Sequence, residues 1–335
     1  MTRMNGRWLA PALWLLSAVL LLLGTGVGST GLDSLSALQR DPQAWQIVWE
    51  IRLPRSVGAW LAGALLGLAG ALAQGLFRNP LADPYLLGSA SGASLGVALA
   101  MALLGVSPLA TEWLSLLGLS GAAFAGAALA VLLTLLLAQG VQHTLRLLLA
   151  GVVVAVVLGA LTSLILLLSP DIMQAMQSFM LGSTSFLAWP ACGLMAVVAL
   201  LCLLAAWAMS PVLDALALGE STAQSLGLPL PALRAALIGV LALATGTAVA
   251  QTGLIAFVGL AAPHLVRSLV QTTPGRLIGL ASLVGAVLLL SADLLARSLL
   301  APRELPVGVL TAVLGGAYLL WLMHRQGRSR KGAAS

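Results

Sequence analysis

Residues 145–168 read LRLLLAGVVVAVVLGALTSLILLL. Arg146 lies near the start of this segment, and no charged residue follows it up to the segment's end. An α-helix needs about 20 consecutive apolar residues to cross the hydrocarbon core of a bilayer. The segment is therefore predicted to be a membrane-spanning helix.

Comparable apolar segments recur along the whole chain, bounded by charges, prolines or glycine clusters. They cover residues 8–28, 56–77, 88–106, 114–138, 145–168, 190–209, 233–252, 254–270, 277–297 and 307–323. The third is rich in glycine and the eighth is interrupted by Gly259, Pro263 and His264, so we expect each of them to be short, broken or partly buried in protein. The first is longer than the apolar region of a signal peptide and is expected to be a retained helix. These segments predict an all-α integral membrane protein of about ten transmembrane helices, with residues 1–335 forming a single transmembrane domain.

The composition supports this interpretation. Of the 335 residues 60% are hydrophobic and only 8% are charged, whereas soluble domains carry about 25% charged residues. This excludes a soluble enzyme, a nucleic-acid-binding protein and a disordered chain. The pI near 10.6 is then explained by the arginine and lysine excess that orients membrane proteins.

The basic residues predict the orientation. With ten spans and both termini in the cytoplasm, eleven basic residues lie inside and five outside, in agreement with the positive-inside rule. The inner residues are Arg3, Arg7, Arg78, Arg146, Arg234, Arg267, Arg276, Arg325, Arg328, Arg330 and Lys331, and the outer residues are Arg40, Arg52, Arg55, Arg297 and Arg303.

The spans offer no chemistry that would make this chain an enzyme or an ion-coupled carrier. All ten acidic residues fall at the ends of spans or in loops, whereas a proton-coupled carrier places a carboxylate or histidine at the bilayer midplane. The three histidines are scattered and predict no metal site. Residues 24–30, GTGVGST, resemble a phosphate-binding loop but lack its lysine. If the chain works against a gradient, the energy must therefore come from another chain.

Small residues recur at helical spacing within the spans. The second span contains Gly63, Gly67, Gly70 and Gly75, and the third opens with Gly88, Gly92 and Gly96. Such spacing lets helices approach closely in lipid. We expect packing within the chain, with a dedicated dimer motif as the alternative.

Two segments outside the spans are candidates for contacts with partners. The inner segment Asp214–Pro231 is predicted to be a short amphipathic helix, broken at Gly227 and stopped by Pro229, and it either meets a partner or is a linker. On the outer side, Arg52 and Arg55, with Arg297 and Arg303 on the same side, either dock an acidic protein surface or extend to lipid phosphates.

Five stretches resemble the permease subunits of ABC importers for iron chelates, haem and cobalamin, in order and over nearly the whole chain. They are RLPRSVGAWLAGALLGLAGALAQGLFRNPLADPYLLGSASGASLG (52–96), RLLLAGV (146–152), LALGESTAQSLGLP (216–229), GLIAFVGLAAPHLVR (253–267) and ELPVGVLTAVLGG (304–316). The resemblance implies a ten-helix type II importer permease that works as a homodimer, with a pathway on the two-fold axis that is lined by the fifth and tenth helices.

The resemblance also assigns roles to residues. Residues 212–231 would form the coupling segment that contacts the ATPase, through Leu218, Gly219, Glu220, Ser221, Ala223 and Gly227; Ser221 and Thr222 stand where the family pattern has alanines. Docking of the periplasmic binding protein would use Arg52, Arg55 and Arg297. The cytoplasmic gate would be formed by Gln142, His143, Thr144 and Leu145, with His143 a polar gate residue rather than a haem ligand. Met173, Met176 and Met180 would lie in a short outer helix, either at the outer mouth or in ordinary packing.

The function implied by the resemblance is import of an iron complex, haem or a ferric siderophore, across the bacterial inner membrane. Two separate ATP-binding subunits would bind ATP and Mg²⁺ and supply the energy, and a periplasmic binding protein would deliver the substrate. This chain itself is expected to bind no cofactor, metal or nucleic acid and to catalyse no reaction. A cobalamin importer is the alternative, and an ion-coupled secondary transporter is a remote one.

Overall fold

The computed structural model describes residues 6–28, 31–32, 42–105, 113–138, 144–225 and 227–332. All ten expected segments are helical: α1 (Gly6–Gly26), α4 (Leu53–Leu76), α5 (Ser89–Leu104), α6 (Trp113–Leu137), α7 (Thr144–Leu168), α9 (Trp189–Ala208), α12 (Leu230–Thr252), α13 (Val258–Leu269), α14 (Pro274–Ser298) and α15 (Val307–Gly332). Within the described residues, seven helices are long and apolar enough to cross a membrane. The predicted fold class is confirmed.

Short elements connect these helices. They are β1 (Val27–Gly28), β2 (Gly31–Leu32), α3 (Pro42–Ile47), the π-helix η1 (Val48–Arg52), the 3₁₀ turns η2 (Pro84–Leu87) and η3 (Pro170–Ile172), α8 (Met173–Leu181), α10 (Ser210–Ala217) and α11 (Glu220–Ser225). β1 and β2 pair antiparallel, with Val27 opposite Leu32. The GTGVGST stretch therefore ends α1 and enters β1, and it does not open a helix as a phosphate-binding loop would.

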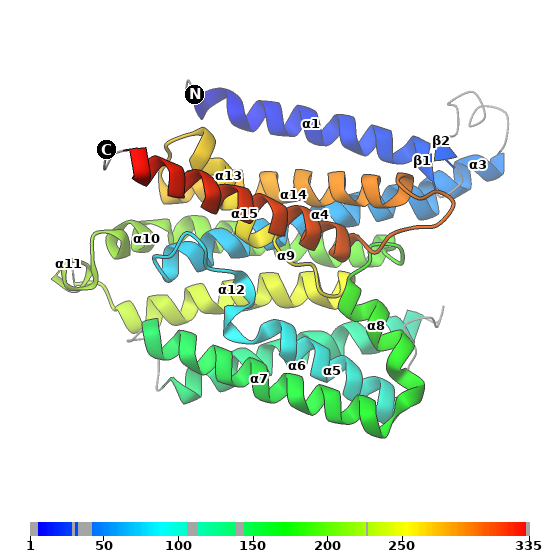
Figure 1. Cartoon of the computed structure of the whole chain (residues 1–335), viewed down its shortest axis with the longest axis horizontal. Helices are drawn as coiled ribbons and strands as arrows, with labels where there is room; N and C mark the ends of the chain where they lie inside the picture. Colours follow the sequence, from blue (N-terminus) through cyan, green and yellow to red (C-terminus); the bar gives the residue numbers. More distant parts are fainter. Residues whose placement is uncertain are drawn as a thin grey trace.

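The long helices run side by side as one bundle (Figure 1). Both termini lie at one end together with α10 and α11, whereas β1, β2, α3 and α8 lie at the other end. We call these the inner end and the outer end, following the orientation predicted from the basic residues. Helices α4 and α14 are buried along most of their lengths and form the centre of the bundle, whereas α1, α7 and α9 are largely exposed.

Glycines allow the central helices to touch at backbone distance. A Cβ atom added to Gly63 of α4 would lie 2.3 Å from the carbonyl oxygen of Gly285 in α14. The same relation holds between α5 and α6, where a Cβ on Gly92 would lie 2.3 Å from the oxygen of Gly126. The glycine pattern of the second and third spans thus packs helices within the chain, as expected.

Two of the helices are short, which is one of the outcomes expected from their glycine and proline content. α5 has 16 residues and α13 has 12, so they extend about 24 and 18 Å, less than the ~30 Å of the hydrocarbon core. The connections that precede them meet, because Tyr85 Oη donates to the carbonyl of Ile255 at 3.1 Å. Pro84 packs against Gly259 at the same place. The polar backbone of both interruptions is therefore enclosed by protein.

Candidate functional sites at the two ends of the bundle

The outer ends of α4 and α14 bring four charged side chains together. Arg55 lies in the first turn of α4, just after Pro54, and Asp293 and Arg297 lie four residues apart on one face of α14. Glu304 follows in the connection from α14 to α15. We call Arg55, Asp293, Arg297 and Glu304 the outer charge cluster.

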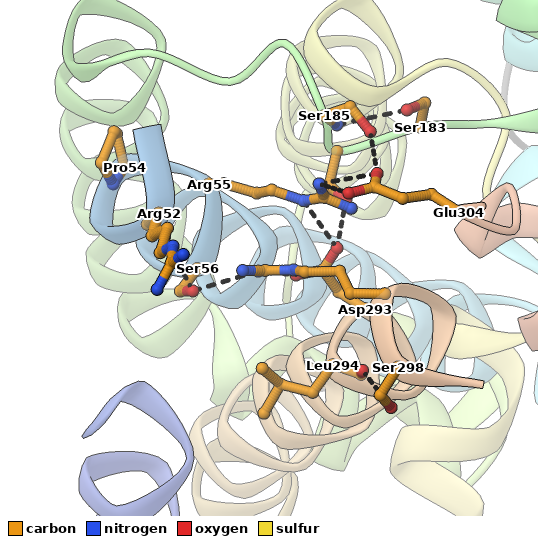
Figure 2. Close-up of polar contacts among 12 residues, drawn as sticks. Arg52, Pro54, Arg55, Ser56, Ser183, Ser185, Asp293, Leu294, Ser298 and Glu304 are labelled. Atoms are coloured by element: carbon orange, nitrogen blue, oxygen red, sulfur yellow. Dashed lines mark hydrogen bonds and ion pairs between the residues drawn. The ribbon is translucent and has the colours of Figure 1, made fainter. Parts of the chain in front are cut away.

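Two arginines divide the oxygens of this cluster between them (Figure 2). Arg55 Nε donates to Asp293 Oδ1 at 3.2 Å, and its Nη1 donates to both oxygens of Glu304, at 2.9 and 2.8 Å. Arg297 Nε donates to Asp293 Oδ2 at 2.9 Å, and its Nη2 contacts the same oxygen. That Nη2 also donates to Ser56 Oγ at 3.0 Å. Asp293 is thus held by a different guanidinium on each oxygen.

Hydroxyl groups from the connection between α8 and α9 complete the cluster. Thr184 Oγ1 donates to Asp293 Oδ1 at 2.5 Å, and Ser185 Oγ donates to Glu304 Oε2 at 3.1 Å. The side chains are 0% exposed for Asp293, 1% for Arg297, 9% for Arg55 and 26% for Glu304. With two positive and two negative charges the cluster is neutral, which is the condition for keeping ionised groups buried.

The three arginines predicted to dock a binding protein are therefore all engaged within the chain. Arg55 and Arg297 belong to the outer charge cluster, and Arg52 is half-buried and donates through Nη1 to the carbonyl of Thr25 at 3.2 Å. Arg303 is exposed beside Glu304. Docking remains a prediction, but it must involve groups that already have partners.

Sequence reasoning placed these arginines at the outer face but did not identify their partners. The Arg55–Glu304 pair joins residues 249 positions apart, which a single sequence does not reveal. One local signal was present: Asp293 and Arg297 stand four residues apart in an otherwise apolar span, the spacing of a helical ion pair.

The connection between α8 and α9 is tied to two further elements, α12 and α15. Ser183 N donates to the carbonyl of Thr252 at the end of α12, at 2.8 Å. Gly308 N, in the first turn of α15, donates to the carbonyl of Gly182 at 3.4 Å. The positive φ of Gly182, +68°, puts it in a conformation that favours glycine. This junction therefore joins α8, α12 and α15 to the outer charge cluster.

The three methionines predicted near the outer mouth lie in α8, which is a short outer helix as expected. Met176 is fully buried, whereas Met173 and Met180 are 44% and 48% exposed. Met176 therefore serves packing. The place of Met173 and Met180 at an outer mouth stays a prediction.

At the inner end, the predicted coupling segment forms two helices and not one. Gly219, at φ +117°, separates α10 from α11, and Gly227, at φ +74°, precedes α12. Leu216 and Ala223 are fully buried against the bundle, whereas Leu218 is 71% exposed. The side chains of Glu220 and Ser221 lie outside the described residues. The segment is thus anchored by its apolar face and presents Leu218 at its turn.

The predicted cytoplasmic gate is described only in part. Gln142 and His143 lie outside the described residues, and Thr144 begins α7. Leu145 is 69% exposed. Within the part of the chain that the structure describes, no group of three or more His, Cys, Asp or Glu side chains could hold a metal ion.

Comparison with known proteins identifies the family. Residues 12–325 match the FecCD transport family. The chain belongs to this family. It is 37% identical over 341 residues to the hemin transport system permease protein HmuU of Yersinia pestis, covering 98% of this chain and all of that protein. It is 38% identical over 327 residues to the vitamin B12 import system permease protein BtuC of Escherichia coli O6:H1, covering 97% of each chain.

Solved structures agree with the FecCD assignment. A metal-chelate type ABC transporter in an inward-facing conformation has a TM-score of 0.85 and 30% identity, covering 96% of this chain and all of that chain. PsaBC from Streptococcus pneumoniae in complex with Fab, at a TM-score of 0.58 and 18% identity over 85% of this chain and 92% of that one, shares the fold alone. This FecCD-family protein is a multi-pass permease of the ABC importer type.

Proposed function

We propose that the chain is the permease of an importer that moves an iron complex, haem or a ferric siderophore, from the periplasm to the cytoplasm of a bacterium. The observation that carries this proposal is the full-length similarity to a hemin permease, supported by the similarity to a metal-chelate transporter. A vitamin B12 permease is equally similar in identity, so cobalamin is the second candidate.

The energy would come from two ATP-binding subunits at the inner end, which would hold ATP and Mg²⁺. The arrangement of α10 and α11 supports this, because their buried face fixes them to the bundle while Leu218 is presented outward. Closure of the ATPase subunits would then bias the permease between its conformations, which is how one site can drive another.

Two further partners are proposed. A second copy of the chain would complete the pathway, with α7 and α15 at the two-fold axis. Their exposed apolar side chains, among them Val156 of α7 and Val313 of α15, suit contact with another copy or with lipid. A periplasmic binding protein with acidic surface groups would dock at the outer end beside Arg52, Arg55 and Arg297, because complementary charge across an interface steers and registers partners.

The substrate is tested by reconstitution. The permease, its ATPase and its binding protein are placed in proteoliposomes, and ATP-driven uptake of haem, a ferric siderophore and cobalamin is compared. We expect uptake of one iron complex and none without ATP. Uptake of cobalamin alone would favour the second candidate, and uptake driven by an ion gradient without the ATPase would refute the ABC mechanism.

Coupling is tested by the change Leu218→Asp. Since Leu218 is 71% exposed, the permease should fold normally while ATPase binding and substrate-stimulated ATP hydrolysis are lost. Leu81→Asp is the matched control, because Leu81 is 52% exposed in the connection after α4, outside the α10–α11 segment. Equal effects of the two changes, or normal coupling in Leu218→Asp, would contradict the assignment.

A further inference from the structure

We propose that Glu304 is an internal substitute for a carboxylate of the binding protein, and that docking exchanges one for the other on Arg55. The inference rests on the proposed docking at the outer end and adds its mechanism. Glu304 would be the residue that leaves, and Arg55 the residue that changes partner.

The geometry singles out Glu304 as the exchangeable carboxylate. Arg55 holds Asp293 through Nε and Glu304 through Nη1, so the two acids occupy separate donors of one guanidinium. Asp293 is fully buried and is also held by Arg297, whereas Glu304 is 26% exposed. Of the two carboxylates on Arg55, Glu304 is therefore the one that an incoming carboxylate can displace.

The charge balance favours exchange over simple addition. The cluster contains two arginines and two carboxylates, all but Glu304 largely buried. A third carboxylate would leave one uncompensated negative charge in this buried setting, which is strongly unfavourable. If Glu304 moves into water as the partner's carboxylate arrives, the cluster stays neutral and Arg55 keeps two charged acceptors.

The exchange would also change contacts outside the outer charge cluster. Glu304 Oε2 also accepts from Ser185 Oγ, so its departure removes one of the ties on the connection between α8 and α9. That connection is hydrogen-bonded to the first turn of α15 through Gly182 and Gly308. Docking would thus loosen the junction of α8 with α15, which the proposed function places beside the pathway.

The first experiment measures docking with the binding protein that supports uptake in the reconstituted system. The permease is held in lipid nanodiscs at low salt. The dissociation constant is determined for wild type, Glu304→Gln, Arg55→Gln, the Glu304→Gln/Arg55→Gln double variant and Arg52→Gln. Glu50→Gln is the matched control, since Glu50 is an exposed outer carboxylate outside the cluster.

Exchange predicts that Glu304→Gln tightens docking about three- to tenfold relative to Glu50→Gln, because an internal competitor for a charged donor is weakened. The gain should vanish when Arg55→Gln is present. Exchange is refuted if Glu304→Gln either has the same effect as Glu50→Gln or weakens docking. If Arg55→Gln weakens docking in that case, the docking proposal itself still holds. If neither Arg52→Gln nor Arg55→Gln affects docking, the docking proposal itself is refuted.

A second experiment has a decisive readout in the wild-type protein. Amide hydrogen exchange of Gly182–Leu187 is followed in the wild-type permease with and without the binding protein. We expect faster exchange in this segment on docking, and faster exchange in Glu304→Gln without any partner. Unchanged or slower exchange of the wild-type segment on docking would overturn the proposal even if Glu304→Gln does not fold.

Discussion

Replacing Asp293 by asparagine tests the outer charge cluster most directly. Asp293 accepts one hydrogen bond from Arg55, two from Arg297 and one from Thr184. Asparagine has the same shape but only one acceptor oxygen, so in either orientation its NH₂ group faces a guanidinium. The change also converts the neutral, buried cluster into one with a net positive charge.

The expected cost follows from these losses. Breaking a buried ion pair by removing one partner lowers the free energy of unfolding by about 3–5 kcal/mol. Adding Arg297→Gln restores neutrality, because Arg55 and Glu304 remain as a balanced pair. The double variant should therefore be more stable than the two single costs predict, with a coupling energy of about 1–3 kcal/mol.

The assay is unfolding of the purified permease by SDS in mixed micelles, followed by the fluorescence of its nine tryptophans. Asp171→Asn serves as control, since Asp171 is an exposed acid at the outer end and should cost less than about 0.5 kcal/mol. The ion-pairing role of the outer charge cluster would be refuted if Asp293→Asn lowered the free energy of unfolding no more than Asp171→Asn does. Strictly additive effects of Asp293→Asn and Arg297→Gln in the double variant would refute it as well.

Three more changes can be measured in the same unfolding assay. Gly285→Ala places a Cβ 2.3 Å from a backbone oxygen of α4 and should lower the free energy of unfolding by about 1–3 kcal/mol. Gly279→Ala, on the same helix, places a Cβ with nothing within 4 Å and should raise it by about 0.5–1 kcal/mol. Changes of the same sign in the two variants would contradict the packing of α4 against α14. Tyr85→Phe removes a 3.1 Å hydrogen bond to the α12–α13 connection and should cost about 0.5–1.5 kcal/mol, so an unchanged midpoint would count against a structural role for it. Met176→Ala leaves a cavity at a buried position and should lower the free energy of unfolding by about 2–5 kcal/mol. Met173→Ala, at an exposed position of the same helix, should lower it by less than about 0.5 kcal/mol. Similar values for the two changes would show that α8 is packed differently.

Most of the fold could be predicted because the bilayer imposes a simple requirement on length and polarity. Residues 145–168 are apolar enough to predict a span without further information, and α7 ends at Leu168 as expected. The shortness of α5 and α13 was also expected from their glycines and from Pro263, although α13 continues through Gly259, Pro263 and His264 without a break. The break at Gly219 was not predicted, because a positive φ cannot be inferred from one glycine in a polar segment.

The outer site could be predicted only in part. Arginine at the outer face is unusual, and this made Arg55 and Arg297 stand out. Their partners depend on how α4, α14 and the α14–α15 connection meet in three dimensions, and the carboxylate of Asp293 carried no sign of its burial beyond its spacing from Arg297. The sequence therefore suggested a role at the surface for Arg55 and Arg297, whereas in the structure both side chains bind other residues of the same chain.

The shortness of α13 has a consequence for biosynthesis. A stretch of 12 helical residues cannot by itself hold a stable place across a bilayer when it leaves the translocon. The α13 segment can reach its final position only when α4 and α14 pack around it and enclose its end within the membrane. Of these two helices, α14 is synthesised after α13. We therefore expect newly made chains to keep this segment accessible to water-soluble labels until residue 298 has emerged from the ribosome.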